Sequence, residues 1–84
     1  MGKLHQKIIR LLRLHLDDLQ DALDDLPAGR VSGVIISPSF NSLSYHARQK
    51  KLNAILKRGL TTSELSAVGA IAALTPAEAN VKAV

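Results

Sequence analysis

The feature that most constrains this chain is a short β-branched run closed by chain breakers on both sides. Residues 31–36 read Val-Ser-Gly-Val-Ile-Ile, with Pro27 and Gly29 shortly before them and Pro38 shortly after. β-branched residues favour strands, and proline cannot donate to a strand ladder, so the run predicts one strand over Val31–Ser37. The Pro-Ala-Gly break in front of it ends any regular element that begins upstream.

The segment before this break has the apolar spacing of a helix. Leucine and isoleucine recur at intervals of three and four residues from Lys3 to about Leu26. Bases lie near its start and aspartates near its end, an order that opposes the helix dipole. This misfit indicates a helix that ends near Leu16 to Asp18, with Leu19–Asp25 as a separate element. Local propensity alone still favours helix in Leu19–Asp25.

A second helix is expected after the strand. Ser42 or Ser44 can cap it, and it runs to about Arg58, where Gly59 is a suitable stop. With steps of 100° per residue, one side of this helix carries Tyr45, Arg48, Leu52, Ile55 and Leu56. The opposite side carries Lys50, Lys51, Lys57 and Arg58. The helix therefore has an apolar stripe with a basic stripe behind it.

The last third of the chain holds two helix start signals and one ambiguous run. Thr61 with Glu64 fits a capping box, and Thr75-Pro76-Ala77-Glu78 predicts the start of a short final helix. Between them, Leu65–Leu74 fits either a helix or a buried strand, because alanines favour the first and Val, Ile and a central Gly allow the second.

Composition limits the fold and excludes several kinds of site. The 84 residues are enough for a single domain, residues 1–84, and one Phe, one Tyr and no Trp leave an aliphatic core. The absence of cysteine excludes disulfides, thiolate zinc sites and a cysteine nucleophile. Charged residues interrupt the N-terminal apolar run, so it is neither a signal-peptide core nor a membrane span. We therefore expect a cytoplasmic protein, with an organellar form after removal of a transit peptide left open.

No residue pattern indicates catalysis or metal binding. His5, His15 and His46 form no convincing metal spacing and are predicted to be exposed on the surface. The aspartates lack the spacing of a calcium loop, and neither a nucleophile motif nor a glycine-rich phosphate loop occurs. We therefore do not expect an enzyme.

Charge is distributed unevenly along the chain. The formal net charge is +4, and five of the seven acidic residues fall in Asp17–Asp25, whereas bases crowd the second helix. Such asymmetry permits an anionic partner, either a nucleic acid or an acidic protein. A solvated charged helix face is the commoner explanation of the pattern.

The stretch from Val34 to Gln49 resembles the central signature of the BolA-like family. An apolar strand ends in serine and is followed by x-Ser-Phe, a further Ser, and Arg-Gln. The residues in register are Ser37, Ser39, Phe40, Ser44, Arg48 and Gln49. Downstream, Leu74-Thr75-Pro76-Ala77-Glu78 resembles the family's closing Thr-Pro-x-Glu, so the resemblance covers about Gly29 to Glu78.

This resemblance implies an α+β fold of the KH-like type. The family order is α-β-β-α-β with a short C-terminal helix, and helices pack on one face of a three-stranded sheet. It implies that Leu19–Asp25 is the first strand, a poor one, and that Leu65–Leu74 is the last one, both against local propensity.

The resemblance also implies an adaptor that partners a monothiol glutaredoxin in iron–sulfur cluster trafficking or in iron and stress regulation. The family's shared two-iron cluster uses a His in the last strand, where this chain has Ser66 followed by Ala67. A second ligand would fall near Pro27 to Arg30, where no Cys or His occurs. Because a serine hydroxyl is a poor iron ligand, we expect no cofactor on the chain alone, and a two-iron cluster shared with the glutaredoxin in a complex is left open. We expect a monomer or a weak homodimer that does not bind membranes.

Two sets of residues are the candidate sites. The resemblance places a partner groove between the second helix and the last strand, with Arg48 helping to form it. The predicted partner-binding residues are Ser39, Phe40, Arg48, Gln49, Ser66 and Ala67. The rival hypothesis is a DNA-binding transcriptional regulator that uses Lys50, Lys51, Lys57 and Arg58. Against it, stacking aromatics are almost missing and no Gly-x-x-Gly loop occurs; a scaffold protein with another partner is a third possibility.

Overall fold

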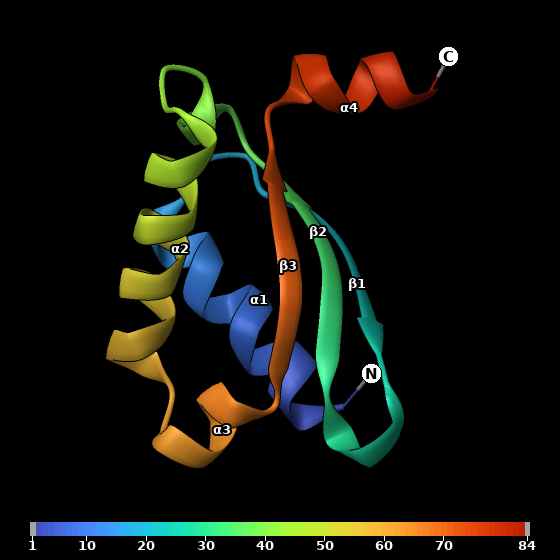
Figure 1. Cartoon of the computed structure of the whole chain (residues 1–84), viewed down its shortest axis with the longest axis vertical. Helices are drawn as coiled ribbons and strands as arrows, with labels where there is room; N and C mark the ends of the chain where they lie inside the picture. Colours follow the sequence, from blue (N-terminus) through green and yellow to red (C-terminus); the bar gives the residue numbers. More distant parts are fainter. Residues whose placement is uncertain (1, 84) are drawn as a thin grey trace.

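The structure is a computed structural model that describes residues 2–83, and the side chains of residues 2–79. Four helices and three strands follow one another along the chain (Figure 1). Their bounds are α1 Lys3–His15, β1 Gln20–Asp25, β2 Val31–Ile36, α2 Tyr45–Gly59, α3 Thr62–Ser66, β3 Val68–Leu74 and α4 Pro76–Ala83. Two short 3-10 turns, Pro27–Gly29 and Pro38–Phe40, flank β2.

The three strands form one mixed sheet with β2 in the centre. β1 pairs antiparallel with β2, and β3 pairs parallel with it. α1 and α2 contact each other, α1 also contacts β1, and α2 contacts β3, while α4 lies beyond the end of β3 (Figure 1). The chain is therefore α+β, as expected, with the short helix α3 as an addition to the expected order. No helix among the described residues is long and apolar enough to span a bilayer.

The end of α1 agrees with the prediction made from its charge order. The helix ends at His15, with the Leu16 N–H donating to the Leu12 carbonyl, and Asp18 then reverses the chain with a φ of 44°. β1 follows although Leu23 is its one buried residue. β1 pairs with β2 along its whole length, from Gln20 opposite Ile36 onward, and this pairing stabilises the strand although its local propensity favours helix.

The core is aliphatic, as the composition predicts. It joins the inner faces of α1 and α2 to the covered face of the sheet, and Phe40 is its one aromatic residue. Fully burying one such side chain contributes about 1.5–3 kcal/mol. The buried members are Ile8, Ile9, Leu12, Leu16, Leu23, Val31, Ile35, Phe40, Leu52, Ile55, Leu56, Leu60, Ile71 and Ala73.

His5 is buried, so the prediction that all three histidines lie on the surface is wrong for this one. Its Nδ1 lies 3.2 Å from Oδ1 of Asp25, whose other oxygen accepts from the Gly2 N–H at 3.1 Å. The Gly2 hydrogen bond, followed by the contact with His5, holds the pKa of Asp25 below its ordinary value. These contacts attach the start of α1 to the end of β1. His15 and His46 are exposed, as predicted.

α2 begins and ends where the sequence predicts, but the predicted burial of one of its side chains, Tyr45, is wrong. Ser44 caps it by accepting from the Ala47 N–H at 3.2 Å. Tyr45 was expected on the apolar stripe but is 60 % exposed, because it occupies the first helical position, beyond the edge of the core. Gly59 is the last helical residue, and a Cβ there would lie 2.4 Å from Cδ2 of Leu11. The glycine thus lets α1 and α2 approach closely.

The stretch Leu65–Leu74 is divided between a helix and a strand. Thr61 and Glu64 form the predicted capping box, with the Thr61 N–H donating to Glu64 at 2.8 Å and the Glu64 N–H donating to Thr61 at 3.2 Å. That cap starts α3, so Leu65 and Ser66 are helical and the strand begins only at Val68. The prediction that the whole run belongs to the last strand is therefore wrong for its first three residues.

Gly33 tests the register of β1 on β2. It has a φ of +142°, and a Cβ built on it would lie 2.2 Å from the Ala22 carbonyl oxygen. We expect Gly33→Ala to lower the free energy of unfolding by at least about 2 kcal/mol, because both strain and a backbone clash oppose it. Gly29→Ala is the matched control. Its φ of +72° faces open space, so it should cost about 1 kcal/mol. Urea unfolding followed by circular dichroism measures both, and equal losses would contradict this explanation.

Candidate partner-binding site

The serines of the Ser-x-Ser-Phe motif fasten the α1–β1 turn to the end of β2. Ser37 is fully buried, and its hydroxyl donates to the Asp17 carbonyl at 2.6 Å while accepting from the Ser39 N–H at 3.1 Å. The Ser39 hydroxyl accepts from the Asp17 N–H at 3.0 Å. Both serine hydroxyls therefore bond the backbone of the chain, and Ser39 holds the turn before β1 in place.

Phe40 lies in the core and has no exposed surface. It packs within the same buried cluster as α1, α2 and the sheet. Because a fully buried ring cannot touch another protein, the prediction that Phe40 contacts a partner is wrong. Its match to the family signature reflects a packing position.

Arg48 joins α2 to the end of β3 and to α4. It is only 8 % exposed, and its Nε donates to the Leu43 carbonyl at 3.0 Å. Its Nη1 donates to the Ala73 carbonyl at 3.3 Å and to Oε1 of Glu78 at 2.6 Å. The Thr75 N–H, followed by Arg48, keeps the pKa of Glu78 below its ordinary value. The apolar-side position of Arg48 was predicted from helical spacing, and its contacts add a structural role.

Gln49 and Arg48 donate to two carbonyls on the outer edge of β3. The Leu74 carbonyl accepts from the Ser37 N–H, so the backbone groups of Leu74 face β2. Because these groups alternate in direction along a strand, the N–H and C=O groups of Ile71 and Ala73 point away from β2. Gln49 Nε2 donates to the Ile71 carbonyl at 3.2 Å, and Arg48 donates to the Ala73 carbonyl. Two acceptors of an edge strand are thereby paired with side chains of α2, which makes this edge less available to another strand.

Ser66 does not lie in the last strand, where the resemblance placed it. It is the final residue of α3, is exposed, and donates its hydroxyl to the Thr62 carbonyl at 3.1 Å. Ala67 caps α3, and its carbonyl accepts from the Val31 N–H at 3.0 Å. An occupied hydroxyl on a helix and a chain without cysteine do not fit an iron–sulfur cluster. Among the described side chains, no three His, Cys, Asp or Glu residues are placed to hold a metal ion.

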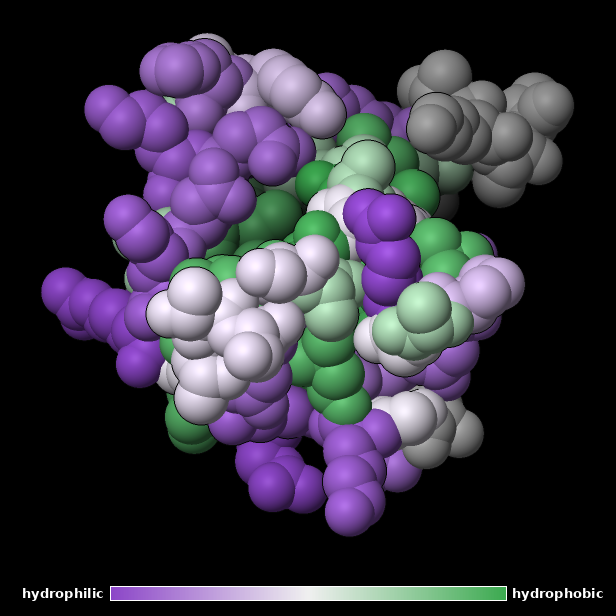
Figure 2. Space-filling view, turned by 60° about the horizontal axis from the view of Figure 1, so that its bottom comes forward, coloured by the Kyte–Doolittle hydropathy of each residue, from purple (hydrophilic) through white to green (hydrophobic). Residues whose placement is uncertain are grey.

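A groove does lie between α2 and β3, at the end near α3. It has a volume of about 350 Å³ and is lined by Asn53, Leu56, Lys57, Leu65 and Val68; we call it the α2–β3 groove. Leu56 is buried, and Leu65 and Val68 are half-buried, so its floor is apolar and Lys57 and Asn53 form an exposed polar wall. Figure 2 shows hydrophilic side chains gathered over α2 on the left, with apolar surface beside them toward the strands.

The basic residues of α2 are exposed, and one of them reaches this groove. Lys50, Lys51, Lys57 and Arg58 make no ion pair with any described residue. Lys57 lines the α2–β3 groove, whereas Lys51 and Arg58 lie on the far side of the helix from it. The structure therefore divides the predicted basic stripe between the groove wall and open solvent.

The observed groove and the predicted partner-binding residues lie at different places along α2 and β3. Of the six predicted partner-binding residues, none lines it. The positions of Leu65 and Val68 beside α2 were not predicted, because both residues were interpreted as parts of one strand. The capping box at Thr61 was the signal that a helix starts there and turns Leu65 toward α2.

Comparison of the chain with protein-family models, with curated proteins and with solved structures gave no match.

Removing Arg48 tests whether it is structural. We expect Arg48→Ala to lower the free energy of unfolding by about 2 kcal/mol, because the part-buried carbonyl of Leu43 and the buried carbonyl of Ala73 lose their donors. Lys51→Ala, on the exposed side of the same helix, should change it by no more than about 0.5 kcal/mol. Denaturant titration compares the two variants. An Arg48→Ala protein as stable as the parent would contradict the role assigned to these hydrogen bonds.

The contacts of Glu78 predict a dependence of stability on pH. Its pKa is lowered from 4.5 in the folded chain, so the stability it contributes is complete above that value and is lost as pH falls through the folded pKa. In Glu78→Gln the loss of stability between about pH 6 and about pH 3 should be smaller than in the parent. Asp24→Asn, at a residue whose side chain has no hydrogen-bond partner among the described residues, is the control and should retain the parent's slope. Identical slopes for the parent and Glu78→Gln would refute the prediction.

Proposed function

We propose that this chain is a BolA-like adaptor that docks a monothiol glutaredoxin in its α2–β3 groove. Three features support the family assignment: the order of helices and strands, the mixed three-stranded sheet, and structural roles for most of the signature residues. Ser37, Ser39, Ser44 and Arg48 each make a hydrogen bond that fixes a turn, a helix start or a helix-to-strand contact. Another residue type at these positions would lose a hydrogen bond that holds this fold together.

The observation that carries the proposal is the α2–β3 groove itself. An apolar floor with a polar, positively charged wall is the arrangement by which proteins commonly bind a segment of another protein. The groove lies where the resemblance places the partner, and Arg48 and Gln49 hold its two walls together without occupying it. The sequence resemblance supplies the identity of the partner.

Docking in this proposal needs no metal ligand from this chain. Ser66 lies outside β3, and the chain has no cysteine, so any cluster in the complex would be held by the partner's own groups. The chain would then act by binding and regulating its partner in iron or stress responses. The chain would contribute a binding surface to the complex and no reactive group.

A second candidate function is nucleic-acid binding through α2. The observation that favours it is the set of four exposed bases on this helix without ion-pair partners among the described residues. The affinity of such binding depends on how many positive charges face the phosphates of the nucleic acid, and it depends little on which of these charges is removed. Protein docking in the α2–β3 groove depends on Lys57 in particular.

Paired charge reversals on α2 separate the two functions. With purified monothiol glutaredoxin under reducing conditions, Lys57→Glu should raise Kd about fivefold or more, because it places an acid on the groove wall. Lys51→Glu makes the same change of charge on the far side of the helix and should leave Kd within about twofold. Isothermal titration calorimetry measures both.

Failure of the parent chain to bind glutaredoxin would end the proposal. Equal losses in the two variants, with a duplex DNA oligonucleotide bound in a strongly salt-dependent manner, would instead establish the second candidate. Circular dichroism of each variant controls for folding, and both side chains are exposed, so both variants should fold.

A further inference from the structure

The helices cover only one face of the sheet. α1 and α2 lie on the same side, α4 lies past the end of β3, and no described helix runs along the other side (Figure 1). We call this uncovered side the open face. Side chains alternate between the two faces of a strand, and Leu23, Ile35 and Ile71 belong to the core, so their neighbours face the open side. The apolar side chains there are Ala22, Val34, Ile36, Ala70, Ala72 and Leu74.

These side chains form rows that run across the three strands. The strand register places Ala22, Val34 and Ala72 side by side in the central row. The next row, toward the end of β2, holds the larger side chains Ile36 and Leu74. The large side chains of the open face are therefore gathered at one of its ends.

The row at the opposite end is made of small side chains. It holds Ser32 on β2, with Ala70 beside it on β3 at the irregularity of the β2–β3 register. If a second copy lies on the open face with its β2 antiparallel to the first, about a two-fold axis at Val34, the large row of each copy lies over the small row of the other. Ile36 then meets Ser32 of the second copy, and Leu74 meets its Ala70. Large side chains over small ones let two layers interdigitate without voids.

Polar side chains at the rim complete this arrangement. Gln20, in the row of large side chains, lies over Asp24 of the second copy, and its amide can donate to that carboxylate. Arg30 comes directly before β2 in extended conformation, so the alternation continues and puts it on the open face. It then reaches the chain beyond the end of the other β2, where Asp17 lies because its carbonyl accepts from the Ser37 hydroxyl. Arg30 makes no ion pair with any described residue, so its guanidinium is available to that carboxylate.

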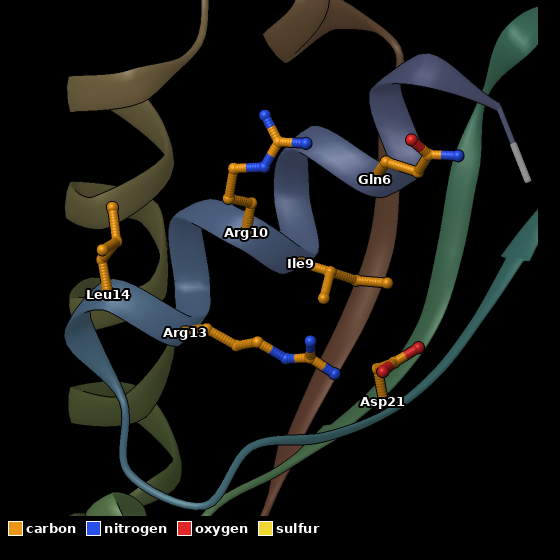
Figure 3. A pocket seen from close by; sticks show the side chains of 6 residues that line it. All are labelled: Gln6, Ile9, Arg10, Arg13, Leu14 and Asp21. Atoms are coloured by element: carbon orange, nitrogen blue, oxygen red, sulfur yellow. The ribbon is translucent and has the colours of Figure 1, made fainter.

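The helix side of the molecule is unsuited to a second copy. A hollow of about 460 Å³ lies between β1 and the outer side of α1; we call it the α1–β1 groove, and it is lined by Gln6, Ile9, Arg10, Arg13, Leu14 and Asp21. Figure 3 shows Arg10 and Arg13 projecting from α1 at this groove. Both are exposed and make no ion pair with a described residue, and the exposed bases of α2 lie on the same side of the sheet. Two copies that met through their helices would therefore bring like charges together.

The outer edge of β1 is also unsuited to a second copy. If two β1 strands paired antiparallel about Leu23, Asp21 of each copy would lie directly opposite Asp25 of the other. Like charges directly opposite each other destabilise a strand pair. On the open face, by contrast, the two-fold arrangement sets no charge opposite a charge of the same sign.

The size of the open face sets the strength of this contact. Strands lie about 4.8 Å apart and rise about 3.3 Å per residue, so three strands of about six residues offer on the order of 300 Å² per copy. A stable complex commonly buries about 800 Å² per partner. The contact should therefore be weak, with a Kd between about 50 μM and about 1 mM.

We propose that the open face binds a second copy of this chain and forms a two-fold symmetric dimer, in which the sheets pack face to face with their β2 strands antiparallel. Val34 lies at the axis, and Arg30 of each copy pairs with Asp17 of the other. The α2–β3 groove lies on the helix side of each copy, so both grooves stay accessible in the dimer. The proposal rests on the sheet alone and does not depend on what that groove binds.

Sedimentation equilibrium of the full chain from about 20 μM to about 2 mM tests the proposal. We expect a monomer–dimer equilibrium in the stated range of Kd, and Arg30→Glu should raise Kd about fivefold or more, because it sets an acid beside Asp17. Arg13→Glu makes the same change of charge on the helix side and should leave Kd within about twofold. Asp17→Arg combined with Arg30→Glu should restore Kd to within about threefold of the parent, because the ion pair is re-formed with its charges exchanged.

Amide chemical shifts locate the contact independently of these variants. On dilution of the isotope-labelled chain over the same range, the shifts of Ala22, Val34 and Ala72 should change, and those of Arg10 and Lys57 should not. A chain that stays monomeric at 2 mM would overturn the proposal and leave the open face to a different protein. Equal effects of Arg30→Glu and Arg13→Glu, no restoration by the exchanged pair, or shifts confined to the helices would also overturn it. Circular dichroism controls for folding, and the three substituted side chains are exposed.

Discussion

The parallel pairing of β3 with β2 is the constraint on which most of this structure depends. Two parallel neighbours cannot be joined by a tight turn, so the chain must cross back over the sheet between Ile36 and Val68. α2 makes that crossing and lies along β3, and the groove between them follows from it. The same arrangement makes β3 an edge strand whose outward carbonyls need donors. Arg48 and Gln49 supply those donors from the helix that the crossing requires.

The two edges of the sheet have different chemistry as a result. At β3, side chains of α2 donate to two outward carbonyls, and an apolar groove with a basic wall lies between this helix and the start of the strand. At β1, no described side chain bonds the outward backbone N–H and C=O groups. Exposed aspartates on this strand instead disfavour its pairing with a strand of another molecule. One small sheet thus carries two separate surfaces with cationic side chains, each formed by one helix and one edge strand.

Much of the fold could be predicted where local chemistry agrees with tertiary structure. β2, α2 with its Ser44 cap, the capping box at Thr61 and the start of α4 all follow from residue types at fixed spacing. β1 could not, because five of its six residues are exposed and only pairing with β2 makes it a strand. The family resemblance anticipated it and also the last strand, but placed the start of that strand three residues too early.

The candidate site was less accessible to sequence reasoning than the fold. Helical spacing placed Arg48 on the apolar side of α2. Its ion pair with Glu78 could not be predicted, because the two residues are 30 positions apart and no local pattern connects them. Phe40 matched a motif that had been interpreted as a surface and is in fact core.

The most direct test of the central claim is an amide chemical-shift map of the isotope-labelled chain titrated with monothiol glutaredoxin. If the partner docks between α2 and β3, the largest shifts should cluster at Asn53, Lys57, Leu65 and Val68, with β1 unaffected. Shifts confined to other surfaces, or none at saturating partner, would contradict it.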